Sequence, residues 1–284
     1  MAWHEDNLTA AETLIHRGEH TKIGQFSCDP GNDAFWHTPA IDNDVFVLPR
    51  LALHLQRNDD GFFFVEPGGL LLHRAGSELS RRPVGKRGDE TWWFAIRPDL
   101  FVETLKKYRL DLNDMGKSFV LPAPGRLSLL GAIRAANDGV VDSDALDARL
   151  FDIFEEICAL KAGLSPQTSA KRPTTRSRRD ALIDRVREYL HANLSKPLDL
   201  KRLADDLGSS PFHLTRTFRE MTGLTPGEYR TRLKAGAIIE TLVRNPAQNL
   251  AALAADHGFS NQSHMNRMLR REVGMTPSQI RGFA

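Results

Sequence analysis

The chain has 284 residues, of which 41% are hydrophobic, and a formal net charge of +2 at pH 7. This length is enough for a packed core and predicts two domains. No apolar run is long enough to span a bilayer and no signal pattern opens the chain, so we predict a cytoplasmic protein and exclude a membrane protein. The two cysteines, Cys28 and Cys158, are too few and too far apart in the sequence for a disulfide framework or a zinc knuckle.

Short β-strands are the first elements that the sequence predicts, between Val45 and Ile96. Short apolar runs alternate there with turn segments that are rich in Gly, Asp and Asn. The runs read VFVL, LALHLQ, FFFVE, GLLLH and TWWFAI. This pattern is typical of a small β-sandwich or barrel.

Two groups of side chains in this N-terminal part are candidates for ligand binding. The aromatic group, which can line a pocket or simply form core, is Phe62, Phe63, Phe64, Trp92, Trp93 and Phe94. The histidines to search for a metal site are His4, His16, His20, His37, His54 and His73. His16 and His20 have a metal-binding spacing if they lie on a helix, but no HxH with a following Glu and no HExxH occurs. We therefore predict no metal and no other cofactor.

After Pro98 the pattern becomes helical, and one predicted helix carries a heptad seam. The seam lies within residues 144–161 and consists of Leu146, Leu150, Ile153, Ile157 and Leu160. It is too short for a free coiled coil, so it packs either on its own domain or on a second copy of the chain. The second possibility predicts a homodimer through residues 144–161, with charged residues such as Asp147 flanking the seam.

The next segment, GLSPQTSAKRPTTRSRR, is rich in Ser, Thr, Pro and Arg and has no apolar periodicity. It predicts a flexible linker over residues 164–179, between an N-terminal domain at 1–163 and a C-terminal domain at 180–284. Residues 171–284 carry 20 Lys and Arg against 11 Asp and Glu, whereas the rest of the chain carries 18 against 25. This asymmetry indicates a polyanionic partner for the C-terminal part.

The strongest pattern is a repeat within the C-terminal part. Helices are predicted over Asp180–Leu194, Leu200–Leu207, Pro211–Thr222, Pro226–Val243, Leu250–His257, Asn261–Val273 and Pro277–Gly282. The segment that begins at Leu200 recurs at Leu250, at an offset of 50 residues that becomes 51 after one insertion. Such a duplication indicates two similar units that perform similar tasks.

Each copy, at about 200–222 and 250–273, has the parts of a helix-turn-helix. A short helix ends at Gly208 or Gly258, where a left-handed residue is needed, and Ser210 or Ser260 can cap the next helix. One face of that next helix is apolar, with Leu214, Phe218 and Met221 in the first copy and Met265, Leu269 and Val273 in the second.

The opposite face of each second helix carries side chains that can read base edges. These are Phe212, Thr215, Arg216 and Arg219 in the first copy, and Ser263, Asn266, Arg267 and Arg270 in the second. In the major groove, Arg can donate two hydrogen bonds to guanine, Asn can pair with adenine, and Thr or Phe can touch a thymine methyl group. The helix Pro226–Val243 is long enough to hold the two copies roughly one DNA turn, ~34 Å, apart.

The segment from about Asp180 to Phe283 resembles the DNA-binding domain of the AraC/XylS family of bacterial regulators. The resemblance rests on GSSPFHLTRTFREMTGLTPGEYR and GFSNQSHMNRMLRREVGMTPSQIR. It implies base contacts by Phe212, Thr215 and Arg216 in the first copy and by Gln262, Ser263, Asn266 and Arg267 in the second. Met265, Leu269 and Ile280 stand where the family usually has aromatic residues, and we expect packing to survive because all three are large and apolar. Strand pattern and domain order resemble the cupin-like sensor domains of many family members.

Together these patterns predict an α+β protein with a β-rich, cupin-like N-terminal domain and an all-α C-terminal domain. The predicted function is a transcription regulator, not an enzyme, that reads two successive major grooves with helices 211–222 and 261–273. Double-stranded DNA is its expected partner, with RNA polymerase and an unidentified small-molecule effector as further candidates. An effector-independent DNA-binding protein and an enzyme with a regulatory DNA-binding domain are the alternatives. No GxSxG, P-loop or GxGxxG motif is present, and two cysteines cannot supply the zinc-bound cluster of a related DNA-repair regulator.

Overall fold

The computed structural model describes residues 11–58, 60–84, 86, 88–112, 114–115, 118–139, 141–164 and 173–283. The chain divides into two compact units. The first comprises Met1–Leu121 with Gly131–Ser165, and the second comprises Pro122–Leu130 with Pro166–Ala284. Residues 122–130 were expected in the N-terminal domain, but they pack with the C-terminal helices.

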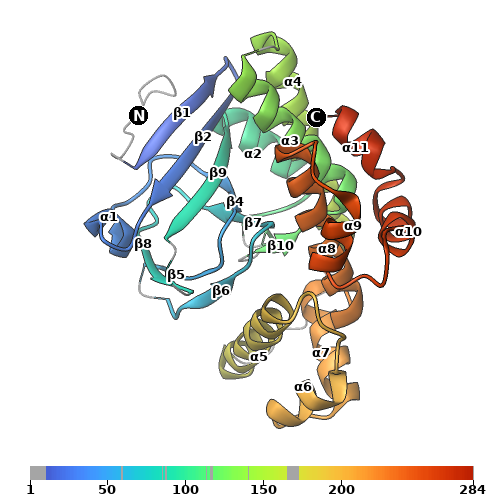
Figure 1. The fold of residues 1–284 in the computed structure, drawn as a ribbon. Helices are drawn as coiled ribbons and strands as arrows, with labels where there is room; N and C mark the ends of the chain where they lie inside the picture. The colour runs from blue at the N-terminus through green and yellow to red at the C-terminus, as the bar shows by residue number, and fades with distance from the viewer. Residues whose placement is uncertain are drawn as a thin grey trace. The chain divides into compact units, whose positions relative to one another are not determined.

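Two antiparallel sheets form the first unit (Figure 1). The larger sheet has the order β1 (Glu12–Arg17), β2 (Thr21–Cys28), β9 (Asp89–Ile96), β4 (Val45–Pro49), β7 (Gly69–His73) and β10 (Phe119–Val120). The smaller sheet has the order β3 (His37–Thr38), β8 (Leu79–Pro83), β5 (Leu53–Arg57) and β6 (Phe63–Val65). A short helix, α1 (Asp33–Trp36), precedes β3. The predicted β-rich N-terminal fold is therefore confirmed.

Side chains from both sheets meet in one apolar core. β2, β4, β7 and β9 contribute Phe26, Val47, Leu71, Trp93 and Ala95, and β5, β6 and β8 contribute Leu53, Leu55, Phe63, Val65 and Leu79. The two core residues of β5, of β6 and of β9 are two positions apart, because successive side chains of a strand point to opposite faces. Gly24 lies opposite Trp93 in the β2–β9 ladder, where the indole ring occupies the space that a Cβ would need.

Three helices complete this part of the chain: α2 (Pro98–Lys107), α3 (Ala123–Asp138) and α4 (Ser143–Leu164). The seam predicted on α4 lies inside the first unit, since Leu146, Leu150, Ile153 and Ile157 are at most 2% exposed. Next to it, the ring of Phe154 stacks on Phe101 of α2 at 5.0 Å between centroids. Burial of these side chains within one chain favours the first alternative, packing on its own domain, and the homodimer through 144–161 stays a prediction.

Asp147 does not flank the seam as a solvated charge but anchors α4 to the β1–β2 turn. Its carboxylate accepts hydrogen bonds from the backbone N–H of His20, at 2.8 Å, and from the hydroxyl of Thr21. A Cβ on Gly18 would collide with this carboxylate, so the turn needs a glycine there. His16 and His20 lie on β1 and in this turn, not on the helix that their spacing suggested.

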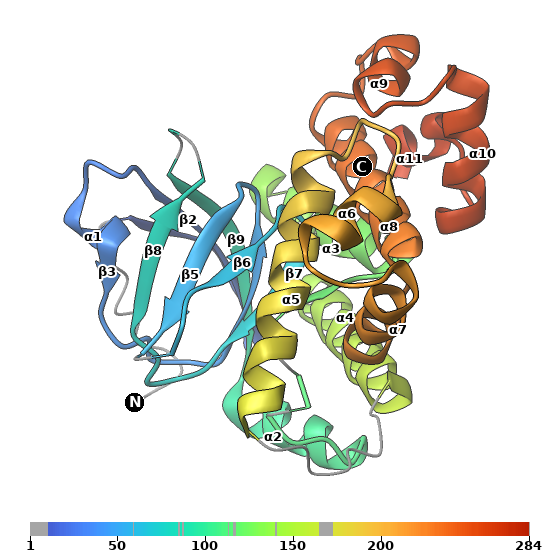
Figure 2. The same ribbon diagram turned by 90° about the horizontal axis from the view of Figure 1, so that it is seen from below.

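The second unit is a row of helices, which Figure 2 shows from a second side. They are α5 (Pro173–Ala192), α6 (Leu200–Asp206), α7 (Pro211–Thr222), α8 (Pro226–Arg244), α9 (Leu250–Asp256), α10 (Gln262–Val273) and α11 (Pro277–Phe283). The predicted all-α C-terminal domain is confirmed. The linker is corrected at both ends, because residue 164 ends α4 and residues 173–179 begin α5; residues 165–172 lie outside the described part.

Helix α8 is the central element of the second unit. It begins with a capping box, in which Thr225 and Glu228 satisfy each other's backbone N–H groups. Ten of its residues are buried, including Leu233, Ile238 and Leu242. The buried guanidinium of Arg126, at the start of α3, lies 3.1 Å from the carboxylate of Glu240 on α8. This ion pair is one contact that joins residues 122–130 to the C-terminal helices.

Candidate nucleic-acid interface

The first helix-turn-helix is built from α6, a tight turn and α7. Asp199 caps α6 by accepting a hydrogen bond from the N–H of Arg202, and Gly208 in the turn has a φ of +61°. Ser210 caps α7 as predicted, since its hydroxyl accepts from the N–H of His213. α7 ends at Gly223, whose φ of +77° is a left-handed conformation.

The second helix-turn-helix, α9 and α10, repeats this construction with one shift. Gly258 again has a positive φ, +68°, as the sequence predicted. The cap of α10 is Asn261, whose carboxamide oxygen accepts from the N–H of His264 at 2.9 Å. The prediction that Ser260 caps this helix is wrong, because the residue inserted in the second copy moves the helix start by one position.

Both second helices bury an apolar stripe and leave the opposite face in solvent. Leu214, Phe218, Met265 and Leu269 are fully buried and Val273 is 9% exposed, as expected. Met221, predicted as the third stripe residue of α7, is 39% exposed, and Thr217 is buried in its place. Met268 is a further buried residue of α10 that the three-residue stripe omitted, although it lies one turn from Met265.

Most of the predicted base-reading side chains lie on the solvent face of α7 and α10. Exposed side chains are Phe212, Arg216, Arg219, Gln262, Ser263, Arg267 and Arg270, while Thr215 and Asn266 are half-buried. The Phe212 ring is 77% exposed, which costs hydrophobic free energy in the isolated protein and favours a partner that covers it. The contacts that these residues make with DNA stay predictions.

The arginine side chains of α7 and α10 differ in their ion pairs. In α7 the guanidinium of Arg216 lies 3.6 Å from Glu220, which Arg179 of α5 also approaches at 3.1 Å. In α10, no hydrogen bond or ion pair within the described residues restrains the side chains of Arg267 and Arg270. The Oδ1 of Asn266 is buried without a hydrogen-bond partner within the same residues. The exposed guanidinium groups of Arg267 and Arg270 therefore have bonding capacity left for base edges, whereas the Asn266 Oδ1 is covered by the chain in this conformation.

α8 joins the two copies and sets their spacing. Its 19 residues give a rise of roughly 28 Å at about 1.5 Å per residue, which is close to one turn of B-DNA at ~34 Å. Burial, with Arg230 nearby, lowers the pKa of Lys234 on α8 to about 8. Burial and the charge of Lys234 also lower the pKa of His257 at the end of α9. The interior behind the exposed helix faces therefore disfavours positive charge.

The first unit contains a separate cavity of about 270 Å³, lined by both sheets. Its apolar wall includes Phe26, Val47, Leu79 and Trp93. Its polar wall includes Arg81, which donates to Asp89 at 2.7 Å and to Thr38 at 2.6 Å. His73 also lines it, and burial, with Arg57 and Arg81 nearby, holds the pKa of His73 well below its usual 6.5.

Of the predicted aromatic group, Trp93 lines this cavity, whereas Phe63, Phe64 and Phe94 are buried core residues. Phe94 stacks on Phe46 at 4.9 Å between ring centroids. Among the residues that the structure describes, no three His, Cys, Asp or Glu side chains are placed to hold a metal ion. His4 lies outside the described residues. In the described part, no helix is long and apolar enough to cross a membrane.

Curated proteins, a solved structure and a family model each resemble all or part of this chain. AdaA of Bacillus subtilis, a bifunctional transcriptional activator and DNA-repair enzyme, is 29% identical over 124 residues, which are 43% of this chain and 58% of that protein. The transcriptional activator RhaR of Klebsiella pneumoniae is 30% identical over 105 residues, 37% of each chain. The chain thus aligns with less than two thirds of the length of either relative.

A solved structure of ToxT from Vibrio cholerae O395 aligns with 97% of this chain and 98% of that chain, with 11% identity and a TM-score of 0.36. A family model described as a helix-turn-helix domain matches residues 203–282, from within α6 to within α11. This range covers both duplicated copies and the helix that joins them. Residues 203–282 are an AraC-type helix-turn-helix domain.

Proposed function

We propose that this protein is a transcription regulator that binds DNA sequence-specifically, with α7 and α10 in two successive major grooves. The observation that carries the proposal is the matched position of Arg216 and Arg267. They occupy equivalent positions in the duplicated helices, and both extend from the exposed face. A lone exposed arginine is ordinary, whereas the same polar face in two copies indicates one shared partner.

The positive charge of the second unit supports a nucleic acid as that partner. The net charge of residues 171–284 is positive while that of the preceding residues is negative. A duplex attracts the basic unit through its phosphates and repels the acidic one. The curated relatives AdaA and RhaR, which match 43% and 37% of this chain, are named as transcriptional activators. An interaction with RNA polymerase stays a prediction.

The test uses the full chain and a DNA duplex selected by it from a random pool. Arg216→Ala and Arg267→Ala should each weaken binding to the selected duplex by about 1–3 kcal/mol and relax preference at one base position. Arg74→Ala, which removes an exposed charge from the first unit, is the matched control. Equal affinity of both variants and wild type at one fixed salt concentration contradicts the assigned reading helices.

We further propose that a small molecule in the cavity of the first unit controls this activity. A ligand site is expected to be concave and mostly apolar with a few placed polar groups, and the cavity beside Arg81, His73 and Trp93 fits that description. The alternative is an effector-independent DNA-binding protein. An enzyme is less favoured, because no catalytic motif occurs in the sequence.

The effector proposal is tested by screening small metabolites for a shift in the thermal unfolding of the full chain. A true effector must also change the affinity for the selected duplex, because regulation requires coupling between two sites. Ala40→Trp places a bulky ring at the edge of the cavity and should abolish the shift, whereas Ala159→Trp, at an exposed position of α4 that does not line the cavity, should not. A ligand that acts equally on both variants binds elsewhere.

A further inference from the structure

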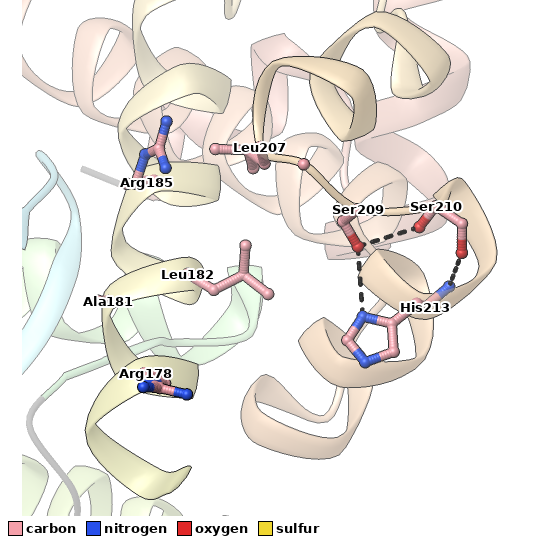
Figure 3. Close-up of a pocket in the computed structure, with 9 residues that line it drawn as sticks. Arg178, Ala181, Leu182, Arg185, Leu207, Ser209, Ser210 and His213 are labelled. Carbon is pink, nitrogen blue, oxygen red and sulfur yellow. Dashed lines mark hydrogen bonds between the residues drawn. The ribbon is translucent and has the colours of Figure 1, made fainter. Parts of the chain in front are cut away.

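A second hollow of the molecule lies within the DNA-binding unit, between α5 and the turn that precedes α7. Its volume is about 570 Å³ (Figure 3). Arg178, Leu182 and Arg185 line it from α5, and Ser209, Ser210 and His213 line it from the turn and the first turn of α7. Figure 3 shows the two arginines on one side and the hydroxyl groups and imidazole on the other.

The residue at the wall of this cleft differs between the two copies. Ser209 of the first copy corresponds to Phe259 of the second, at the repeat offset of 50 residues. The Phe259 ring contacts His264 edge-on at 5.4 Å between centroids and lies 4.8 Å from the Lys234 Nζ. At Ser209 only a hydroxyl contacts the corresponding imidazole, at 3.2 Å between Oγ and Nδ1 of His213. The first copy therefore has a small hydroxyl side chain where the second copy has an aromatic ring.

The charge on the cleft wall is positive and is not neutralised by the chain. Arg178 and Arg185 lie two turns apart on one face of α5, both are exposed, and neither guanidinium has a hydrogen bond or ion pair within the described residues. The nearby carboxylates serve other arginines. Glu220 pairs with Arg179, and Asp184 pairs with Arg187 at 3.2 Å.

The position of the cleft identifies the anion that reaches it. It borders the N-terminus of α7, whose helix dipole also favours negative charge. A helix that enters the major groove is flanked by the phosphates of the groove edges, which are the anions that a bound duplex would bring near this cleft. We propose that the cleft binds a phosphodiester group of the DNA strand, held by Arg178 and Arg185 with the hydroxyl groups of Ser209 and Ser210. This inference rests on the proposed DNA binding and adds an interaction that carries no base preference.

The experiment measures the dissociation constant of the full chain at several salt concentrations, on the selected duplex and on an unrelated one. Arg178→Gln with Arg185→Gln should weaken binding by the same factor on both duplexes. The slope of log K against log salt should become shallower by about 0.9 for each phosphate that the variant no longer neutralises. Arg74→Gln, which removes an exposed charge from the first unit, should leave the slope unchanged.

A second variant tests the cleft without removing charge. Ser209→Phe places the ring of the second copy in the first, and it should lower the salt slope as the double arginine variant does while both guanidinium groups remain. Circular dichroism and thermal unfolding establish that each variant is folded. If Ser209→Phe does not fold, the arginine pair decides the question alone.

The possible failures are distinguishable. An unchanged slope in the double arginine variant overturns the phosphate site, while discrimination between the two duplexes by wild type still supports the proposed function. If wild type binds the selected and the unrelated duplex equally well, sequence-specific binding is overturned. The salt dependence of binding to either duplex then still tests the cleft. If inorganic phosphate raises the melting temperature of wild type but not of the double variant, and the slopes are equal, the cleft takes a free anion and the proposal is wrong.

Discussion

The Nε–H of Arg187 donates a hydrogen bond to the hydroxyl oxygen of Tyr229 at 3.0 Å, and both side chains are buried. This bond joins α5 to α8, the helices that precede the two helix-turn-helix copies. The Tyr229 ring also packs edge-on against Phe218 of α7, with centroids 5.2 Å apart. One side chain of α8 therefore contacts two other helices of the second unit, α5 and α7.

Tyr229→Phe keeps the ring and removes the acceptor of this bond. We expect a loss of about 1–3 kcal/mol in the free energy of unfolding, because a buried guanidinium loses a hydrogen-bond partner. Chemical denaturation followed by circular dichroism measures the loss. Tyr189→Phe, on a half-buried residue of α5, is the control and should change stability by less than about 0.5 kcal/mol. An equal effect of both substitutions contradicts this role of Tyr229.

The cap of α10 gives a second prediction. Asn261→Ala removes the acceptor for the N–H of His264 and should cost about 1 kcal/mol. Ser260→Ala, at the cap that the sequence suggested, should cost less than about half of that, because its hydroxyl accepts no backbone N–H of α10 within the described contacts. Thermal unfolding of the two variants compares them directly. If Ser260→Ala lowers stability more than Asn261→Ala does, the cap of α10 is Ser260, as the sequence alone predicted.

Asp147 gives a third prediction, in the first unit. Asp147→Asn removes one of two charged acceptor oxygens that bind the β1–β2 turn through His20 and Thr21. We expect a loss of about 1–3 kcal/mol, since these bonds are buried or half-buried and involve an ionised group. Asp152→Asn, an exposed residue of the same helix, is the matched control. The unfolding transition of the first unit should move only for Asp147→Asn.

The buried seam of α4 makes a fourth, qualitative prediction. Ile153→Glu puts a carboxylate among side chains that are at most 2% exposed, so the first unit should unfold instead of yielding a folded monomer. Loss of near-ultraviolet circular dichroism together with increased dye binding would report this. A folded Ile153→Glu protein of reduced molecular mass in sedimentation would instead support the dimer seam.

His73 predicts a pH dependence. Burial first, and then Arg57 and Arg81, lower its pKa well below 6.5 in the folded protein, whereas an unfolded histidine titrates near 6.5. Below this pH the unfolded chain binds a proton that the folded chain does not, so stability falls as the pH decreases, by at most about 1.4 kcal/mol per pH unit. Unfolding free energies at pH 7.5 and 5.5 should differ less in His73→Gln than in wild type. His37→Gln, at an exposed site, should retain the wild-type difference.

Helices α7 and α10 were predictable because the sequence contains two copies of the same segment, which can be compared with each other. Two copies with the same glycines, hydroxyl residues and apolar spacing define helix ends that one copy alone leaves open. Two details of these helices were predicted wrongly, the burial of one side chain and the position of one helix cap. Met221 has the spacing of a stripe residue but faces solvent, and the inserted residue moved the α10 cap from Ser260 to Asn261.

The N-terminal unit was predictable only in outline. The strand β2 was missed because its run, TKIGQFSC, mixes polar residues and a glycine with apolar ones, and only its partner β9 shows that both faces are covered. The seam on α4 has the same period whether it faces a second chain or its own sheet. The cleft at Ser209 was missed as well, since periodicity does not show which residues oppose each other across a turn.

The two helix-turn-helix copies follow each other in the same order along the chain, and α8 leads from one directly into the next. Symmetric dimers match palindromic sites, because a two-fold axis presents identical helices to both half-sites. Here Thr215 and Arg216 occupy one reading face, and Asn266 and Arg267 occupy the other. A site read as we propose is therefore not a palindrome and has a direction. Under this proposal, inverting the site would reverse the orientation of the bound protein relative to a promoter, and one copy of the chain would suffice to distinguish upstream from downstream.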